Sequence, residues 1–193
     1  MENIIEKAKQ IHEDNVKKGF WDNETPESRT TECLALIHSE VSETLESFRK
    51  NKWADIEQFE DDQKSWIADF RKDFKANIKD TVEDELADTA IRILDLIGAW
   101  KFNYTDDEIY DCSISNDKSD ISDNVPEAIT FIHHKITFTY RGFQISDNFK
   151  LFLLELYFLI EEWSKKLEID LDKHIELKLE YNRSREYKHG KML

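Results

Sequence analysis

The chain has 193 residues, of which 36% are charged, and it contains only four glycines and two prolines. So few turn-forming residues argue against a β-rich protein and favour a single all-α domain over residues 1–193. The net charge of −15 argues against nucleic-acid binding, because such proteins need a basic face to displace the counterions of phosphates.

The chain shows no feature of a membrane or secreted protein. Its charged opening is not typical of a signal peptide. The longest apolar run, residues 151–160, is interrupted by Glu155 and is shorter than the roughly 20 residues that span a bilayer. Cys33 and Cys112 have no metal-type spacing and are expected to be free thiols. We therefore expect a cytoplasmic protein without a membrane partner.

Apolar residues recur at helical spacing along most of the chain. A first helix is expected to end at Gly19, and Phe20 and Trp21 then fall in a loop as exposed aromatics. Thr105 and Glu108 have capping-box form and predict one short helical turn within the polar stretch 102–125. The longer helices are expected over 2–18, 27–50, 53–77, 80–101, 126–141, 147–168 and 171–188.

Three residues mark expected helix ends. Pro126 suits the first position of a helix that Gly142 ends, and Asp170 can cap the last helix. The chain contains no convincing strand, so the sequence predicts an α-helical bundle of six or seven helices.

Two pairs of carboxylates stand out on the expected helices. Glu40 and Glu43 form E-x-x-E, and Glu85 and Asp88 form E-x-x-D. Residues three apart are neighbours on a helix, so each pair can present two carboxylates together. If the two helices pack, four hard oxygen ligands converge, which suits Mg²⁺. The alternative is that these acids are merely solvated, and spacing alone does not decide between the two.

Four separated segments together resemble a known family. They are residues 18–21 (KGFW), 35–49, 85–95 and 178–191. In this order they resemble the MazG-like family of all-α nucleoside triphosphate pyrophosphohydrolases. The resemblance covers somewhat under a third of the chain.

The resemblance implies a reaction and a set of metal ligands. The family cleaves between the α- and β-phosphates, giving a nucleoside monophosphate and pyrophosphate. Glu40, Glu43, Glu85 and Asp88 would be ligands of Mg²⁺, with Mn²⁺ as a substitute. Either Glu40 or Glu43 would be the catalytic base that accepts a proton from the attacking water.

The last helix and the tail beyond it carry the candidate phosphate-binding groups, although a solvated basic tail is the competing interpretation. Lys178 and Asn182 are four residues apart, and Arg185 follows three residues later, so we expect one shared helical face. Trp21 either stacks on the base or is an ordinary packed aromatic. His38 is interpreted as a helix-packing residue rather than a ligand. The candidate substrate-binding residues are Trp21, Lys178, Asn182, Arg185, His189 and Lys191.

Residues 51–78 and 102–166 are expected to be insertions relative to the family. Within the second, residues 132–139 resemble 37–44, so that Lys135 replaces Glu40 and Phe138 replaces Glu43. Residues 154–158 likewise match the stretch 85–88, with Phe158 in place of Asp88. A degenerate internal repeat that keeps the helices and loses the metal is one hypothesis, and chance similarity of amphipathic helices is the other.

The sequence thus predicts a cytoplasmic, Mg²⁺-dependent enzyme that hydrolyses (deoxy)nucleoside triphosphates. The chain would be a homodimer, or a monomer if the repeat replaces a partner. The main alternative is a non-catalytic helical nucleotide-binding or protein-interaction module on the same scaffold. A hydrolase of nucleoside diphosphates or of a modified nucleotide is a further alternative.

Overall fold

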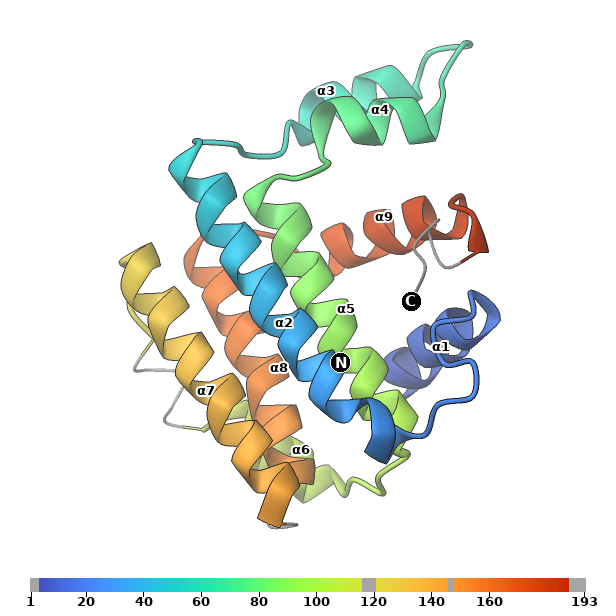
Figure 1. Cartoon of the computed structure of the whole chain (residues 1–193). Helices are drawn as coiled ribbons and strands as arrows, with labels where there is room; N and C mark the ends of the chain where they lie inside the picture. Colours follow the sequence, from blue (N-terminus) through green and yellow to red (C-terminus); the bar gives the residue numbers. More distant parts are fainter. Residues whose placement is uncertain (1–3, 116–120, 146–147, 188–193) are drawn as a thin grey trace.

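The computed structural model describes residues 4–115, 121–145 and 148–187, and this part of the chain contains nine α-helices and no strand (Figure 1). The predicted all-α fold is therefore confirmed. The helices are α1 (Ile4–Lys17), α2 (Pro26–Arg49), α3 (Ile56–Gln63), α4 (Phe70–Asn77), α5 (Val82–Trp100), α6 (Asp106–Ser113), α7 (Val125–Ile145), α8 (Phe149–Lys166) and α9 (Leu171–Arg183).

Side-chain caps determine where several helices begin. The Thr25 hydroxyl accepts the backbone N–H of Ser28, and Pro26 holds the first position of α2. Thr81 caps α5 in the same way. Asp170 caps α9, as predicted from the sequence. The predicted capping box of Thr105 and Glu108 is also present, and it starts the eight-residue helix α6.

Three predicted helix boundaries are wrong. Residues 53–77 form two helices, because the Asp69 side chain accepts the backbone N–H of Lys72 and begins α4 anew. Gly142 does not end α7; it is buried inside the helix, where packing offsets the helix cost of glycine, about 1 kcal/mol. The last helix stops at Arg183 and not at residue 188, which lies outside the described residues.

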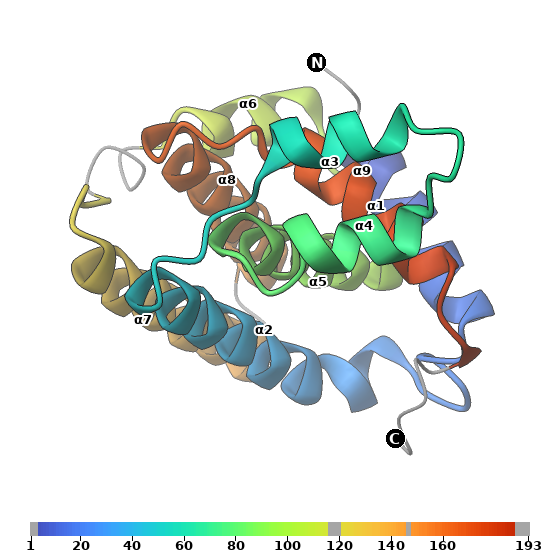
Figure 2. The same ribbon diagram turned by 90° about the horizontal axis from the view of Figure 1, so that it is seen from above.

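Helices α2, α5, α7 and α8 form the central bundle. Helix α2 packs on α5 and α7, and α8 packs on the same two helices (Figure 2). Fully buried side chains from each helix meet in the core, including Ile37, Leu94, Ile132 and Ile160. Burial of this apolar surface is the main stabilising contribution to the bundle.

Helices α1 and α9 both pack against α5 from outside the bundle. Gly98 permits the close approach of α1, because a Cβ atom at this position would lie 2.3 Å from the backbone oxygen of Ala8. Helix α5 is consequently covered on most sides. Its first turn buries three acidic residues, Glu83, Asp84 and Glu85, which is unusual because acidic side chains are almost never fully buried without a partner.

Helices α3 and α4 come from the predicted insertion 51–78 and form a separate layer, at the top of Figure 1. Their own small core contains Phe59, Phe74 and Ile78. The Phe74 ring stacks on Tyr181 of α9 with centroids 4.5 Å apart. This layer thereby supports the helix that carries the predicted phosphate-binding residues.

The lengths of the apolar helices and the state of the two cysteines agree with the sequence. No helix in the described ranges has the length and apolarity needed to cross a membrane. Cys33 and Cys112 are free and buried, as expected from their spacing.

Candidate metal centre

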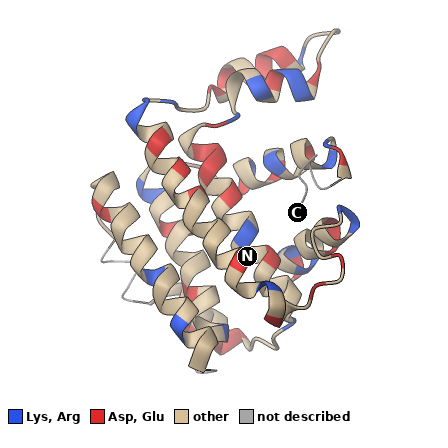
Figure 3. Ribbon diagram, in the orientation of Figure 1, with Lys and Arg blue, Asp and Glu red and all other residues tan. Residues whose placement is uncertain are grey.

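The packing of α2 on α5 brings the two predicted carboxylate pairs together. Ligand oxygens of Glu40, Glu43 and Glu85 all lie within 4.8 Å of one another. In Figure 3, acidic segments lie on both helices in the part of the bundle nearest to α3 and α4. Three of the four predicted metal ligands thus converge at one point between two helices, although they lie up to 45 positions apart in the chain.

The fourth predicted ligand, Asp88, is engaged by a lysine. Nζ of Lys178 lies 2.7 Å from Oδ2 of Asp88 and 2.7 Å from Oδ1 of Asp84. Lys178 is only 5% exposed, so this ammonium group is buried among the acids. The lysine that was predicted to bind phosphate therefore lies in the carboxylate cluster and pairs with Asp84 and Asp88.

Asp84 is a member of the cluster that the sequence interpretation missed. Its carboxylate is 1% exposed, and it also accepts the backbone N–H of Asp80. A second group of acids that could hold a cation contains Asp80, Asp84 and Glu85. The available signal was the acidic first turn of α5, where carboxylates interact favourably with the helix dipole.

The two glutamates of α2 differ in their surroundings. Oε1 of Glu40 accepts a hydrogen bond from Nε of Arg92 at 2.6 Å and forms an ion pair with Nη2 at 2.5 Å, and Glu40 is buried. Glu43 is exposed and accepts a hydrogen bond from the Ser39 hydroxyl at 3.1 Å. Arg92 therefore fixes Glu40, whereas solvent reaches Glu43.

Burial disfavours the ionised form of the carboxylates at this site. Desolvation, together with the nearby charges of Asp84 and Asp88, raises the pKa of Glu85 to about 8. Desolvation also raises the pKa of Asp84 to about 6, against the opposing effect of Lys178. The pKa of Glu40 is raised by desolvation in spite of Arg92.

A bound cation would stabilise the ionised form of these clustered carboxylates. Burial disfavours the Lys178 ammonium, but Asp88 and Asp84 outweigh burial and raise the lysine pKa. Among the described residues no hydrogen bond or ion pair reaches the Glu85 carboxylate, which is 5% exposed. Hard oxygen donors without hydrogen-bond partners suit Mg²⁺, so the residues present fit that ion.

The predicted phosphate-binding residues are only partly assembled. Oδ1 of Asn182 is buried and has no hydrogen-bond partner within the described part of the chain; it lies one helical turn after Lys178. Arg185 lies beyond the end of α9, with its guanidinium 5.9 Å from the ring of Tyr181, so the expected shared helical face is wrong for this residue. His189 and Lys191 lie outside the described residues.

Trp21 is packed and is not the exposed loop aromatic that the sequence predicted. Its side chain is 8% exposed, and its Nε1 donates to both carboxylate oxygens of Asp95 at 3.1 Å. Its ring contacts the edge of His12, and the Arg29 guanidinium lies 5.5 Å from its centroid. The packed-aromatic interpretation describes Trp21 in this structure.

His38 packs between helices, as interpreted from the sequence. Its ring stacks on His133 of α7 with centroids 5.0 Å apart, and the two Nδ1 atoms are 2.7 Å apart. One ring must donate and the other accept in this hydrogen bond.

Comparison of the chain with protein-family models, with curated proteins and with solved structures found no match. The case for a metal centre consequently depends on the geometry just described. Its elements are the convergence of Glu40, Glu43 and Glu85, the raised pKa values of Glu40 and Glu85, and the buried lysine that pairs with Asp84 and Asp88.

Proposed function

We propose that the chain is an Mg²⁺-dependent hydrolase that converts (deoxy)nucleoside triphosphates into the monophosphate and pyrophosphate. The observation that carries the proposal is the convergence of Glu40, Glu43 and Glu85 within 4.8 Å. The resemblance of residues 35–49 and 85–95 to MazG-like enzymes supplies the reaction.

Glu40, Glu43, Glu85 and Asp88 would hold the metal, with Mn²⁺ as a substitute for Mg²⁺. When bound, the metal neutralises the charge of the triphosphate and polarises the phosphorus that is attacked. A chain with a net charge of −15 needs this neutralisation before a polyanion can approach.

The residues of α9 and its continuation would position the phosphates. Lys178 already lies beside Asp84 and Asp88, and its ammonium can exchange a carboxylate for a phosphate oxygen. The buried Oδ1 of Asn182 has no hydrogen-bond partner among the described residues, so the amide can turn to present its NH₂ group. Arg185, which lies beyond the end of α9, adds a guanidinium group that can donate two hydrogen bonds to one phosphate.

We assign proton acceptance to Glu43. Arg92 holds Oε1 of Glu40 from two nitrogens, whereas the only described partner of the Glu43 carboxylate is the Ser39 hydroxyl. An exposed carboxylate beside the metal ligands is accessible to the attacking water and can accept its proton.

The test is an assay of products. The purified chain is incubated with each nucleoside and deoxynucleoside triphosphate and Mg²⁺, and pyrophosphate and orthophosphate are measured separately. We expect pyrophosphate as the first product and a loss of about 100-fold or more in kcat for Glu43→Gln, since general bases typically contribute this much.

Glu46→Gln is the matched control. Glu46 lies three residues further along α2, is exposed, pairs with Lys50 and Arg49, and is not among the acids whose oxygens converge. This variant should keep the wild-type rate. Orthophosphate as the first product would show that a different bond is cleaved. Nucleotide binding without turnover of any triphosphate would favour the non-catalytic binding module.

A further inference from the structure

The C-terminal part of the bundle repeats the packing pattern of the N-terminal part. Helix α1 packs on α5 and α2 packs on α5; in the same way, α6 packs on α8 and α7 packs on α8. The two groups of three then join through α2 with α7 and α5 with α8 (Figure 2). This is the arrangement of two similar units that face each other.

A contact between aligned positions supports this relation. The similarity of residues 37–44 to 132–139 pairs His38 with His133, 95 positions later. These two histidines stack on each other and share a 2.7 Å hydrogen bond between their Nδ1 atoms. A position meets its own counterpart only near a two-fold axis, and two helices that resemble each other by chance have no reason to show such a contact.

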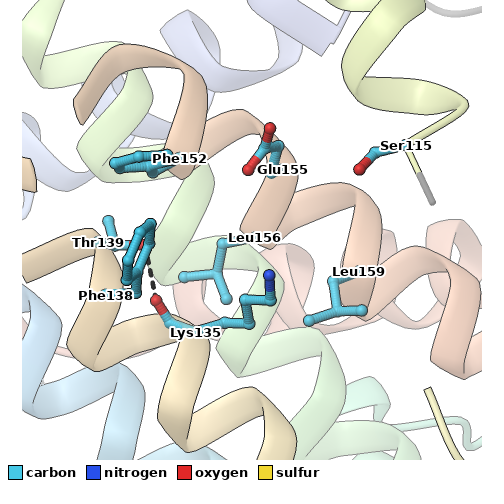
Figure 4. A pocket seen from close by; sticks show the side chains of 8 residues that line it. All are labelled: Ser115, Lys135, Phe138, Thr139, Phe152, Glu155, Leu156 and Leu159. Atoms are coloured by element: carbon cyan, nitrogen blue, oxygen red, sulfur yellow. Dashed lines mark hydrogen bonds between the residues drawn. The ribbon is translucent and has the colours of Figure 1, made fainter. Parts of the chain in front are cut away.

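A small pocket between α7 and α8 is lined by the counterparts of three of the four candidate metal ligands (Figure 4). Lys135 and Phe138 align with Glu40 and Glu43, and Glu155, three residues before Phe158, aligns with Glu85. All three of these residues line the same pocket of about 20 Å³. Positions that correspond by sequence similarity alone therefore converge in space.

We propose that this pocket is a second, degenerate copy of the candidate metal centre, in which the Lys135 ammonium replaces the divalent cation. The inference rests on the proposed function, because the parent site is taken to bind a metal. Phe138 removes one oxygen donor, and the remaining space is barely that of one water molecule. The Lys135 ammonium supplies positive charge in the pocket that it lines together with Glu155, so this half binds no metal.

The test is to restore the lost carboxylates. The double variant Lys135→Glu/Phe138→Glu is titrated with Mn²⁺, and bound ion is measured from the loss of the free Mn²⁺ signal in electron paramagnetic resonance. We expect the double variant to bind about one more Mn²⁺ per chain than the wild type, because the two introduced carboxylates and Glu155 then converge as hard oxygen ligands. Adding Glu155→Gln should abolish the gain.

Lys135→Gln/Phe138→Gln is the matched control, because it has the same side-chain volumes without the carboxylates, and it should gain no ion. A Lys135→Glu/Phe138→Glu variant with the helix content of the wild type but no additional Mn²⁺ would overturn the proposal. If the wild type itself binds no Mn²⁺, the proposed function fails, and the difference between variant and wild type still decides the inference.

A thermal double-mutant cycle decides the matter if the restored variant does not fold. Lys135→Met should lower Tm by about 2–4 °C, since it removes the ammonium that the proposal places in one pocket with Glu155. Lys135→Met/Glu155→Leu should recover most of this loss. Additive effects of the two substitutions would show that Lys135 does not balance Glu155, which contradicts the proposal.

Discussion

At the scale of single residues, Lys178 is the group on which the acidic cluster depends for stability. It comes from α9 and neutralises Asp84 and Asp88 of α5 with two contacts of 2.7 Å. Removing one partner of a buried ionic network leaves the other charges without compensation, which costs more than an exposed ion pair contributes.

We expect Lys178→Met to lower the free energy of unfolding by about 3–5 kcal/mol, measured by urea denaturation in EDTA. Lys173→Met is the control on the same helix, because Lys173 pairs with Glu60 on the surface. That variant should unfold at nearly the wild-type urea concentration. Equal effects of the two substitutions would show that the buried lysine does not stabilise the cluster.

The raised pKa of Glu85 predicts a pH dependence of stability. Its pKa rises from the ordinary 4.5 to about 8 on folding, mainly by desolvation. Between these values the folded chain keeps a proton that the unfolded chain releases, so this group makes the metal-free protein less stable as the pH rises. Asp84, with its pKa raised to about 6, acts in the same direction at lower pH.

The measurement compares Tm of the wild type and of Glu85→Gln in EDTA between pH 5.5 and 8.5. The wild type should lose about 4 °C or more relative to the variant over this interval. Mg²⁺ should raise the Tm of the wild type more at pH 8.5 than at pH 5.5, because the metal requires the ionised carboxylate. Parallel pH profiles of the two proteins would contradict the assigned pKa.

At the scale of helices, local signals in the sequence predicted most of the fold. The caps of α6 and α9 were recognised because Thr105 and Asp170 act through hydrogen bonds to the nearest turn. The break between α3 and α4 was missed because no glycine or proline interrupts residues 64–69. The continuation of α7 through Gly142 depends on tertiary packing, which overrides a weak local preference.

The site could be predicted only as far as it depends on α2 and α5. The spacing of the two carboxylate pairs, together with the family resemblance, predicted Glu40, Glu43 and Glu85 as ligands. These three residues converge in the structure. The contact of Asp88 with Lys178 could not be predicted, because it depends on where α9 docks. The burial of Trp21 likewise depends on a distant partner, Asp95.

The crossing of α1 and α5 gives a prediction for an element. Gly98→Ala would place Cβ 2.3 Å from the oxygen of Ala8 and 2.7 Å from Cβ of His12. We expect a loss of about 1–3 kcal/mol in the free energy of unfolding, because backbone cannot move aside easily. The direction of the change in stability is informative, because replacing glycine by alanine in an open helix normally makes the protein more stable. A more stable variant would contradict the close crossing.

At the scale of the whole molecule, the two halves of the bundle cover each other. Besides contacting each other, α2 packs on α7 and α5 packs on α8 of the same chain. A second copy of the chain is therefore not needed to complete the core, which favours the monomer among the two states that the sequence left open.

We therefore expect a single species of about 23 kDa, the mass of one chain, in size-exclusion chromatography with light scattering. The mass should not change across a wide range of protein concentration. A stable species of twice this mass would show that α6–α8 do not take the place of a partner.

A crystal grown with Mn²⁺ at pH 8.5 would show whether carboxylates of α2 and α5 bind a divalent cation. We expect an anomalous difference peak coordinated by Glu40, Glu43 and Glu85, whose oxygens already lie within 4.8 Å of one another, with Asp88 turned from Lys178 toward the ion. A map with no peak between these residues at saturating Mn²⁺, or with Lys178 still bound to Asp84 and Asp88 and the metal elsewhere, would contradict this expectation.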